Sequence, residues 1–186
     1  GLVGSEMCVR GCTRADISVA STKEAARLVD KLRKKVDIIC IRPLSKSLMS
    51  YALKDKRVDL ILLAPPLSFR LSPSMFSLAH QNDIAIELHT SFLLRNDGIM
   101  RSKVISLYRL IASYSFAEKA PIVLSSGAKR WFEIRGFSGF LGLGRSIGFD
   151  KSAVINAVIA GPKKIIERNL LKLSKNYVAR GVVRLD

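Results

Sequence analysis

Short apolar segments alternate with amphipathic segments along the whole chain, and this alternation limits the folds that the chain can adopt. Strands are expected at residues 1–6, 36–41, 58–63, 84–88, 121–124 and 182–183. Between most of them, apolar residues recur at helical spacing. A buried strand followed by a helix, repeated several times, is typical of a parallel sheet with crossover helices. Because no linker divides residues 1–186, we expect one α/β domain.

Local signals mark several helix ends and irregular segments. Ser21–Glu24 reads Ser-Thr-Lys-Glu, a capping-box pattern that predicts a helix start with Ser21 as the cap. Residues 7–20 show neither the helical nor the strand periodicity of apolar residues and are expected to be irregular. The glycine-rich segment 136–148 is expected to be a tight turn. Asp150 is expected to begin a helix that Gly161 and Pro162 then break.

The charge of the chain indicates an anionic partner. Thirty-one Lys and Arg residues against 15 Asp and Glu give a net charge of +16, with an isoelectric point near 10.2. Such an excess is most often found in proteins that bind nucleic acid. No apolar run approaches the roughly 20 residues of a membrane span, so no membrane partner is expected. Three scattered cysteines fit the reducing cytoplasm better than a disulfide scaffold.

One stretch, Pro121–Arg135, combines a predicted strand with features that suit a polyanion. Its apolar start is followed by Ser125, Ser126 and Gly127, which are turn and helix-cap residues. Three cations and two adjacent aromatic residues come next: Lys129, Arg130, Trp131, Phe132 and Arg135. Guanidinium groups and helix N-termini favour phosphate. One of the two aromatic side chains is expected to point into the core, and an exposed one would be free to stack on a base.

Several segments are similar to a known family. Ser-Ser-Gly-Ala at 125–128, after an apolar strand and before basic and aromatic residues, resembles the archaeal and eukaryotic ribonuclease P protein component 3 family. Residues 57–61, Arg-Val-Asp-Leu-Ile, and the C-terminal segments at 148–153 and 157–162 also resemble it. The resemblance covers nearly the whole chain.

The resemblance implies a fold and a function. The fold would be a reduced TIM-like β/α barrel, similar to the barrels of the polymerase and histidinol phosphatase phosphoesterases. Periodicity alone does not separate such a barrel from an open doubly wound sheet. Residues 1–6 resemble the second strand of the family, so a first barrel strand is expected to be missing from this sequence.

The implied function is that of a protein subunit of ribonuclease P, which removes the 5′ leader from precursor tRNA. The family's RNA carries the catalytic centre and its magnesium, so no catalytic residue, metal site or cofactor is expected in this chain. The implied partners are the ribonuclease P RNA, the component 2 protein, other ribonuclease P proteins, and precursor tRNA through the holoenzyme.

The alternative is an autonomous metal-dependent phosphoesterase on the same barrel. Such an enzyme needs several fixed ligands and an open coordination position. The chain has only two histidines, His80 and His89, and only Glu87 and His89 alternate off one strand end. Ser125 and Ser126 lack the glycine elbow of a serine nucleophile. These residues are too few to form the metal site of such an enzyme.

Basic residues follow most of the predicted strands. In a parallel barrel the loops after the strands share one face, which makes these residues candidates for RNA binding. They are Arg42, Lys46, Arg70, Arg95, Arg101, Lys129, Arg130 and Arg135. A second candidate surface is the basic side of the last helix, opposite Ile166, Leu170, Leu173 and Tyr177, and it carries Lys164, Arg168, Lys172 and Lys175. The sequence leaves open which surface faces RNA and which faces protein.

Overall fold

The computed structural model of the chain describes residues 2–3, 12–173, 177–179 and 182–183. Its strands are β1 (Leu2–Val3), β2 (Arg14–Ile17), β3 (Ile38–Ile41), β4 (Leu60–Leu62), β5 (Ala85–His89), β6 (Ile122–Ser125), β7 (Tyr177–Ala179) and β8 (Val182–Val183). Its helices are α1 (Thr22–Arg33), α2 (Lys46–Lys54), α3 (Pro73–Gln81), α4 (Ser91–Leu94), α5 (Gly98–Glu118), α6 (Phe137–Ile147), α7 (Lys151–Ile155) and α8 (Gly161–Leu173). A 3-10 turn, η1 (Trp131–Glu133), precedes α6, and a π-helical segment, η2 (Asn156–Ala160), joins α7 to α8. Among these helices none is long and apolar enough to cross a bilayer.

The main sheet follows the order of the chain without reversal, β1-β2-β3-β4-β5-β6. Strands β2 to β6 are parallel, and only β1 runs antiparallel to its neighbour β2. A doubly wound sheet would reverse its strand order at a switch point, whereas a barrel adds each strand next to the previous one. The parallel sheet is confirmed, and its sequential order is that of a barrel.

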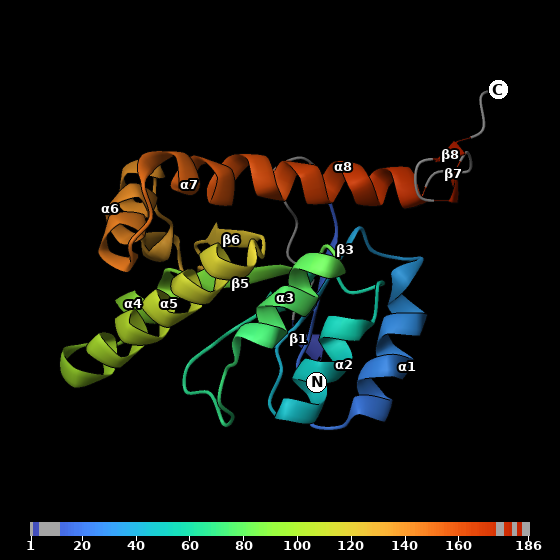
Figure 1. Cartoon of the computed structure of the whole chain (residues 1–186), viewed down its shortest axis with the longest axis horizontal. Helices are drawn as coiled ribbons and strands as arrows, with labels where there is room; N and C mark the ends of the chain where they lie inside the picture. The colour runs from blue at the N-terminus through green and yellow to red at the C-terminus, as the bar shows by residue number, and fades with distance from the viewer. Residues whose placement is uncertain (1, 4–11, 174–176, 180–181, 184–186) are drawn as a thin grey trace.

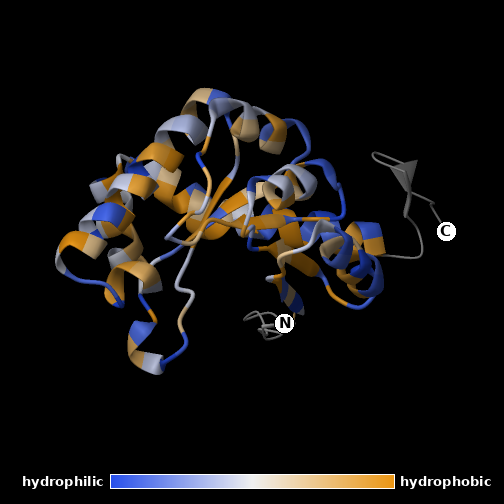
Figure 2. Cartoon of the chain, turned by 90° about the horizontal axis from the view of Figure 1, so that it is seen from below, coloured by the Kyte–Doolittle hydropathy of each residue, from blue (hydrophilic) through white to orange (hydrophobic). Residues whose placement is uncertain are grey.

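Side chains alternate between two apolar layers, one on each face of the sheet. On the outer face Ile39, Ile61 and Ile86 join the larger core under α1 to α5. On the inner face Cys40 and Val123 pack in a smaller core that includes Ile165 of α8. Figure 1 shows the strands lying between the α1–α5 helices and the long α7–α8 helix, and Figure 2 shows the strands as the most apolar part of the chain. A helix therefore covers the inner face of this reduced barrel.

The expectation of an irregular segment at 7–20 is wrong for residues 14–17, which form β2. This strand carries little apolar signal because Arg14 and Asp16 are charged and face the interior of the barrel. The two side chains neutralise each other there, with the Arg14 Nη2 atom 2.7 Å from Asp16 Oδ1. Ile17, on the other face, enters the outer core. Residues 7–11 lie outside the described part of the chain.

The glycine-rich segment 136–148 is a helix, α6, and not the expected tight turn. Phe140, Leu143 and Ile147 recur at helical spacing and are buried. Gly144 completes this stripe because a Cβ there would lie 2.2 Å from Val154 Cγ2. The glycine thus permits close packing of α6 on α7.

The predicted helix break at Gly161 and Pro162 is also wrong. The backbone stays helical from Lys151 to Leu173 because the π-helical turn η2 precedes the proline. A wider turn leaves room for a residue that has no N–H to donate. The result is the single long helical rod at the top of Figure 1.

Two helix starts follow the expected residues but differ in their bonding. Helix α1 starts after Ser21 as predicted, although the Ser21 hydroxyl accepts no capping hydrogen bond. Asp150 does cap α7, because its Oδ1 accepts a 2.7 Å hydrogen bond from the Ala153 amide. Such caps satisfy amides that have no partner inside the helix.

Helix α8 turns a different face to the sheet from the one that its apolar stripe predicts. Ile165 and Asn169 are buried, whereas Leu170 is 50% exposed. Polar bonds determine this rotation: the Asn169 side-chain amide donates to the Asp37 carbonyl at 2.9 Å, and Arg168 Nη2 donates to Asp59 Oδ1 at 3.0 Å. Lys175, another residue of the predicted basic face, lies outside the described residues.

Candidate nucleic-acid interface

The loop after β6 is held in one conformation by the loop after β5. The amides of Thr90 and Ser91 donate to the carbonyls of Ser125 and Ser126, each at 2.9 Å. Gly127 has a φ of +54°, and a Cβ at this position would lie 2.2 Å from the Nδ1 atom of His89. Only glycine fits such a close approach in the left-handed region. The strand-end loop, defined here as residues 126–137, therefore starts from a rigid base.

A buried carboxylate fixes the far side of the strand-end loop. Glu133 accepts hydrogen bonds from Arg95 Nε at 2.7 Å and from Arg95 Nη2 at 2.5 Å. It also accepts one from the Lys129 amide at 2.7 Å. These hydrogen bonds lower the pKa of Glu133 to about 2, with the Arg95 guanidinium as the main cause. Arg95 and the Lys129 amide thus meet at one carboxylate, which joins the loops after β5 and β6.

Both aromatic residues of the loop point outward, so the expectation that one enters the core is wrong. Trp131 is 83% exposed and Phe132 is 48% exposed. Their rings meet edge to face with centroids 5.7 Å apart, and Arg130 Cζ lies 5.8 Å from the Phe132 centroid. Glu133 takes the inward position of this 3-10 turn because Arg95 and a loop amide bind it. An indole and a phenyl ring are thus presented to solvent beside several cations, as in proteins that stack on unpaired bases.

Neutralising Glu133 should loosen this loop. We expect Glu133→Gln to increase collisional quenching of the fluorescence of Trp131, the only tryptophan of the chain, at neutral pH. The folded-state pKa lies below the usual 4.5, so the ionised carboxylate stabilises the fold fully above about pH 4.5. That contribution disappears as the pH falls toward 2, where wild type and variant should converge. Glu24→Gln on α1 is the exposed control. Equal quenching of the wild type and both variants at pH 7 would contradict the role of Glu133 in holding the loop.

Eight of the predicted RNA-binding cations lie in loops or helix starts that follow the parallel strands. Arg42 and Arg70 belong to the loops after β3 and β4, and Lys46 begins α2 after the first of these loops. The Ser68 hydroxyl joins the two loops by donating to the Leu44 carbonyl at 2.5 Å. The other five belong to the segments after β5 and β6: Arg95, Arg101, Lys129, Arg130 and Arg135. We call these eight residues the strand-end cations.

Two of the candidates on the last helix, Lys164 and Arg168, lie toward the opposite ends of the strands. Arg168 bonds Asp59 Oδ1 and donates from Nη1 to the Asp83 carbonyl at 2.6 Å, just before β4 and β5 begin. Its guanidinium therefore holds α8 on the sheet. Lys164, one turn earlier on α8, is exposed. The structure does not bring this pair together with the strand-end cations.

The inner face of the barrel contains a polar cluster where a related phosphoesterase would need metal ligands. Arg14 binds both oxygens of Glu87, with Nη1–Oε1 at 2.8 Å and Nη2–Oε2 at 2.6 Å. Ser125 Oγ donates to Glu87 Oε1 at 2.8 Å, and His89 Nε2 lies 3.4 Å from the same oxygen. Burial alone would raise the pKa of Glu87, but the Arg14 charge and the His89 contact hold it well below its usual range.

This cluster is a poor metal site. A guanidinium occupies the coordinating oxygens of Glu87, and the second carboxylate, Asp16, is bound to the same Arg14. Burial raises the pKa of the nearby Cys40 thiol, so a thiolate ligand is disfavoured. Within the described residues, no three His, Cys, Asp or Glu side chains are placed to share an ion. The arrangement does not favour the alternative of an autonomous metal-dependent phosphoesterase.

Sequence reasoning missed three residues that organise these sites: Arg14, Asp59 and Glu133. Each is a charged residue inside a segment whose other residues gave the stronger signal. Asp59 interrupts the apolar run of residues 58–63, and an acid in a buried strand is a signal that a cation must come from elsewhere. Glu133 is the one acid in a basic loop, which is a weaker signal of the same kind.

The fold and the site together define a reduced parallel β/α barrel with an inner carboxylate neutralised by arginine and a rigid basic and aromatic loop at its strand ends. Such a surface suits an anionic partner. The family model described as RNase P subunit p30 matches residues 5–174, so the chain belongs to this family.

Curated relatives from archaea agree with this membership. The chain is 27% identical over 180 residues to ribonuclease P protein component 3 of Natronomonas pharaonis, covering 97% of this chain and 75% of the relative. It is 32% identical over 161 residues to the protein of the same name from Methanosarcina barkeri, covering 86% of this chain and 66% of the relative.

A solved structure has the same fold. It is a chain of the cryo-EM structure of archaeal ribonuclease P with mature tRNA, which superposes with a TM-score of 0.81 at 22% identity. The match covers 94% of this chain and 75% of the other chain. The likeness supports the predicted reduced TIM-like fold.

Proposed function

We propose that this chain is a protein subunit of ribonuclease P and supports its RNA in removing the 5′ leader from precursor tRNA. The observation that carries the proposal is the family match across residues 5–174. The names of the relatives, ribonuclease P protein component 3, and of the complex in which the same fold occurs, support it.

The chain would contribute binding and not chemistry. The strand-end cations would neutralise phosphates, and Trp131 and Phe132 would stack on unpaired bases, a combination that suits single-stranded RNA. The catalytic magnesium would belong to the RNA, and the occupation of Glu87 by Arg14 supports this proposal. The strand-end loop would supply a preformed surface because its backbone is fixed before RNA arrives.

The proposed partners follow from the same role. They are the ribonuclease P RNA, the component 2 protein, other ribonuclease P proteins, and precursor tRNA through the assembled holoenzyme. The proposed location is the cytoplasm, whose reducing conditions suit a buried thiol such as that of Cys40.

Binding of ribonuclease P RNA should quench Trp131 and should depend strongly on salt. Each phosphate neutralised adds about 0.7 to 0.9 to the slope of log affinity against log salt, so four contacts would give a slope near −3. The measurement is a titration of the purified chain with ribonuclease P RNA, followed by tryptophan fluorescence at several salt concentrations. A flat salt response with an unchanged Trp131 signal would show that the strand-end loop does not hold the RNA.

A further inference from the structure

A cavity of about 450 Å³ opens at the end of the barrel where β5 and β6 begin, away from the strand-end loop. It lies between those strands and the rod formed by η2 and α8, and we call it the strand-start pocket. The residues that the argument uses come from several elements: Ser115, Phe116, Lys119, Phe149, Asn156 and Lys164. Its volume falls in the range of small-molecule sites, about 300 to 1,000 Å³.

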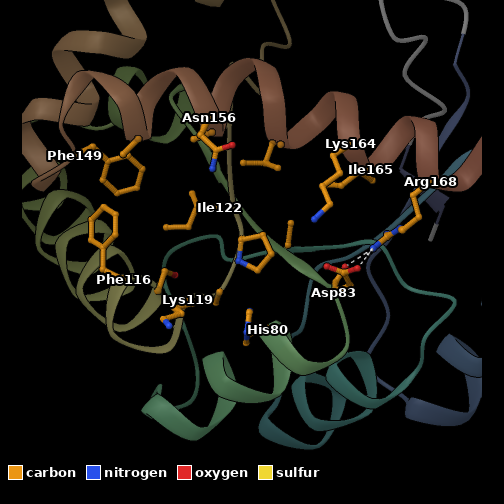
Figure 3. A pocket seen from close by; sticks show the side chains of 18 residues that line it. His80, Asp83, Phe116, Lys119, Ile122, Phe149, Asn156, Lys164, Ile165 and Arg168 are labelled. Atoms are coloured by element: carbon orange, nitrogen blue, oxygen red, sulfur yellow. Dashed lines mark hydrogen bonds and ion pairs between the residues drawn. The ribbon is translucent and has the colours of Figure 1, made fainter. Parts of the chain in front are cut away.

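One side of the strand-start pocket is aromatic, and its floor is apolar. Phe116 and Phe149 meet with ring centroids 5.0 Å apart and planes at 63°, and Figure 3 shows them together on one side. Ile122 and Ile165 line the floor between the sheet and α8. Phe116 is 52% exposed, so a planar ligand has access to its ring. Flat heteroaromatic groups are well suited to such a wall.

The polar atoms of the strand-start pocket include a buried hydroxyl without a partner. Ser115 is 2% exposed, and its Oγ forms no hydrogen bond with any residue that the structure describes. Buried hydroxyls are normally bonded, so an orphan that lines a cavity indicates a ligand or water that completes it. Asn156 points into the same cavity from η2, a π-helical turn of the kind often found at functional sites.

Two ammonium groups at the rim are available for an anion. Lys119 and Lys164 form no ion pair with the described residues, although both line the pocket. The remaining cation, Arg168, is occupied by Asp59 and Asp83, whose charges it offsets. Figure 3 shows Lys164 reaching in from α8 and Lys119 below Phe116. Lysine commonly binds phosphate, and its ammonium group acts as a point charge.

We propose that the strand-start pocket binds one nucleotide, with its base against Phe116 and near the Ser115 hydroxyl and its phosphate between Lys119 and Lys164. An aromatic wall, an orphan donor and two free ammonium groups match the three parts of such a ligand. The nucleotide is either a free ribonucleoside monophosphate or an unpaired nucleotide of an RNA strand. The site is separate from the strand-end loop and does not depend on the proposed function.

Calorimetric titration of the full chain with adenosine and uridine monophosphates tests the free-nucleotide source. We expect one of them to bind, and its nucleoside or inorganic phosphate alone to bind about tenfold more weakly or less. Lys119→Ala with Lys164→Ala should weaken binding about tenfold or more. Lys163→Ala, which removes an exposed charge from the same helix, should leave binding unchanged. Circular dichroism checks the fold of each variant.

The RNA source is tested with a short hairpin that carries one unpaired nucleotide and with the same hairpin fully paired. If only the unpaired nucleotide strengthens binding, and the paired lysine variant removes that gain, the occupant belongs to RNA. The inference is overturned if neither monophosphates nor the hairpin lose affinity in the Lys119 and Lys164 variant. It is also overturned if bound monophosphate quenches Trp131, because the ligand would then sit at the strand-end loop. If Lys129→Ala with Arg130→Ala does not weaken RNA binding, the proposed role of the strand-end loop fails, but nucleotide binding in the strand-start pocket is not affected. The two proposals are therefore tested separately.

Discussion

Replacing Asp59 with alanine should lower the free energy of unfolding by about 3 to 5 kcal/mol, the usual loss when one partner of a buried ion pair is removed. Asp59 is 1% exposed and binds two cations, with Arg33 Nη1 at 2.7 Å and Arg168 Nη2 at 3.0 Å. It also accepts the Ile39 amide at 2.9 Å. Its loss would leave two guanidinium groups facing each other without a counter-charge, where α8 meets the sheet. Urea unfolding followed by circular dichroism measures the change.

The matched control is Asp30→Ala, which breaks the exposed ion pair with Arg57. Asp30 is 82% exposed, and such surface pairs contribute about 0 to 1 kcal/mol. If Asp59→Ala is too unstable to measure, Arg168→Met removes one of the two cations and should cost about 1.5 to 3 kcal/mol, the worth of a charged hydrogen bond. Equal losses in the Asp59 and Asp30 variants would show that the buried network does not hold α8.

Removing two charges from the strand-end loop should weaken RNA binding and reconstituted tRNA processing by about 10- to 100-fold, since charge-assisted hydrogen bonds are worth about 1.5 kcal/mol or more each. The change is Lys129→Ala with Arg130→Ala. Both side chains are exposed, and the backbone of the loop is held by Glu133 and Gly127, so the fold should not change. The salt slope should fall by about 1.4 to 1.8, the share of two phosphates.

Lys23→Ala with Lys31→Ala is the control for this charge removal. These exposed lysines lie on α1, on the outer side of the sheet, and the pair removes the same charge from the chain. Affinity and activity should stay close to wild type. Comparable losses from both double variants would mean that net charge, and not the strand-end loop, governs the interaction. Loss only after removal of Lys164 would move the RNA surface to α8.

The strands of the outer core could be predicted because their signal is local. Residues 36–41, 58–63, 84–88 and 121–124 are mostly apolar, and each range overlaps a strand of the parallel sheet. The barrel order of the sheet, in contrast, was expected only from the family resemblance, because a doubly wound sheet has the same alternation of strands and helices. The single domain and the missing first strand stay predictions.

The remaining features depend on partners that are distant in sequence. β2 escaped prediction because Arg14 is stabilised by Glu87, which lies 73 residues away. The prediction of the buried face of α8 was wrong because Arg168 binds Asp59, which is 109 residues away in the sequence. This ion pair outweighs the burial of Leu170. Local periodicity reports where apolar residues recur, but it does not report which charge will meet its counter-charge in the fold.

The strand-end loop shows the same limit. Its cations and its rigid start were visible in the sequence, whereas the outward direction of Trp131 depends on Glu133 being drawn inward by Arg95. Helix α6 was not predicted because its glycines are typical of turns. One of them, Gly144, allows the close approach of Val154. In each case the deciding contact joins two elements that packing brings together.

The central claim, that this chain supports a catalytic RNA and is not itself the nuclease, is tested most directly by reconstituted cleavage of precursor tRNA. Ribonuclease P RNA and the component 2 protein are assayed in magnesium with and without this chain, and the chain is assayed alone with magnesium or manganese. We expect the chain to accelerate cleavage by the RNA and to cleave nothing alone. Metal-dependent cleavage by the chain alone that disappears in Glu87→Gln or His89→Ala would contradict the claim.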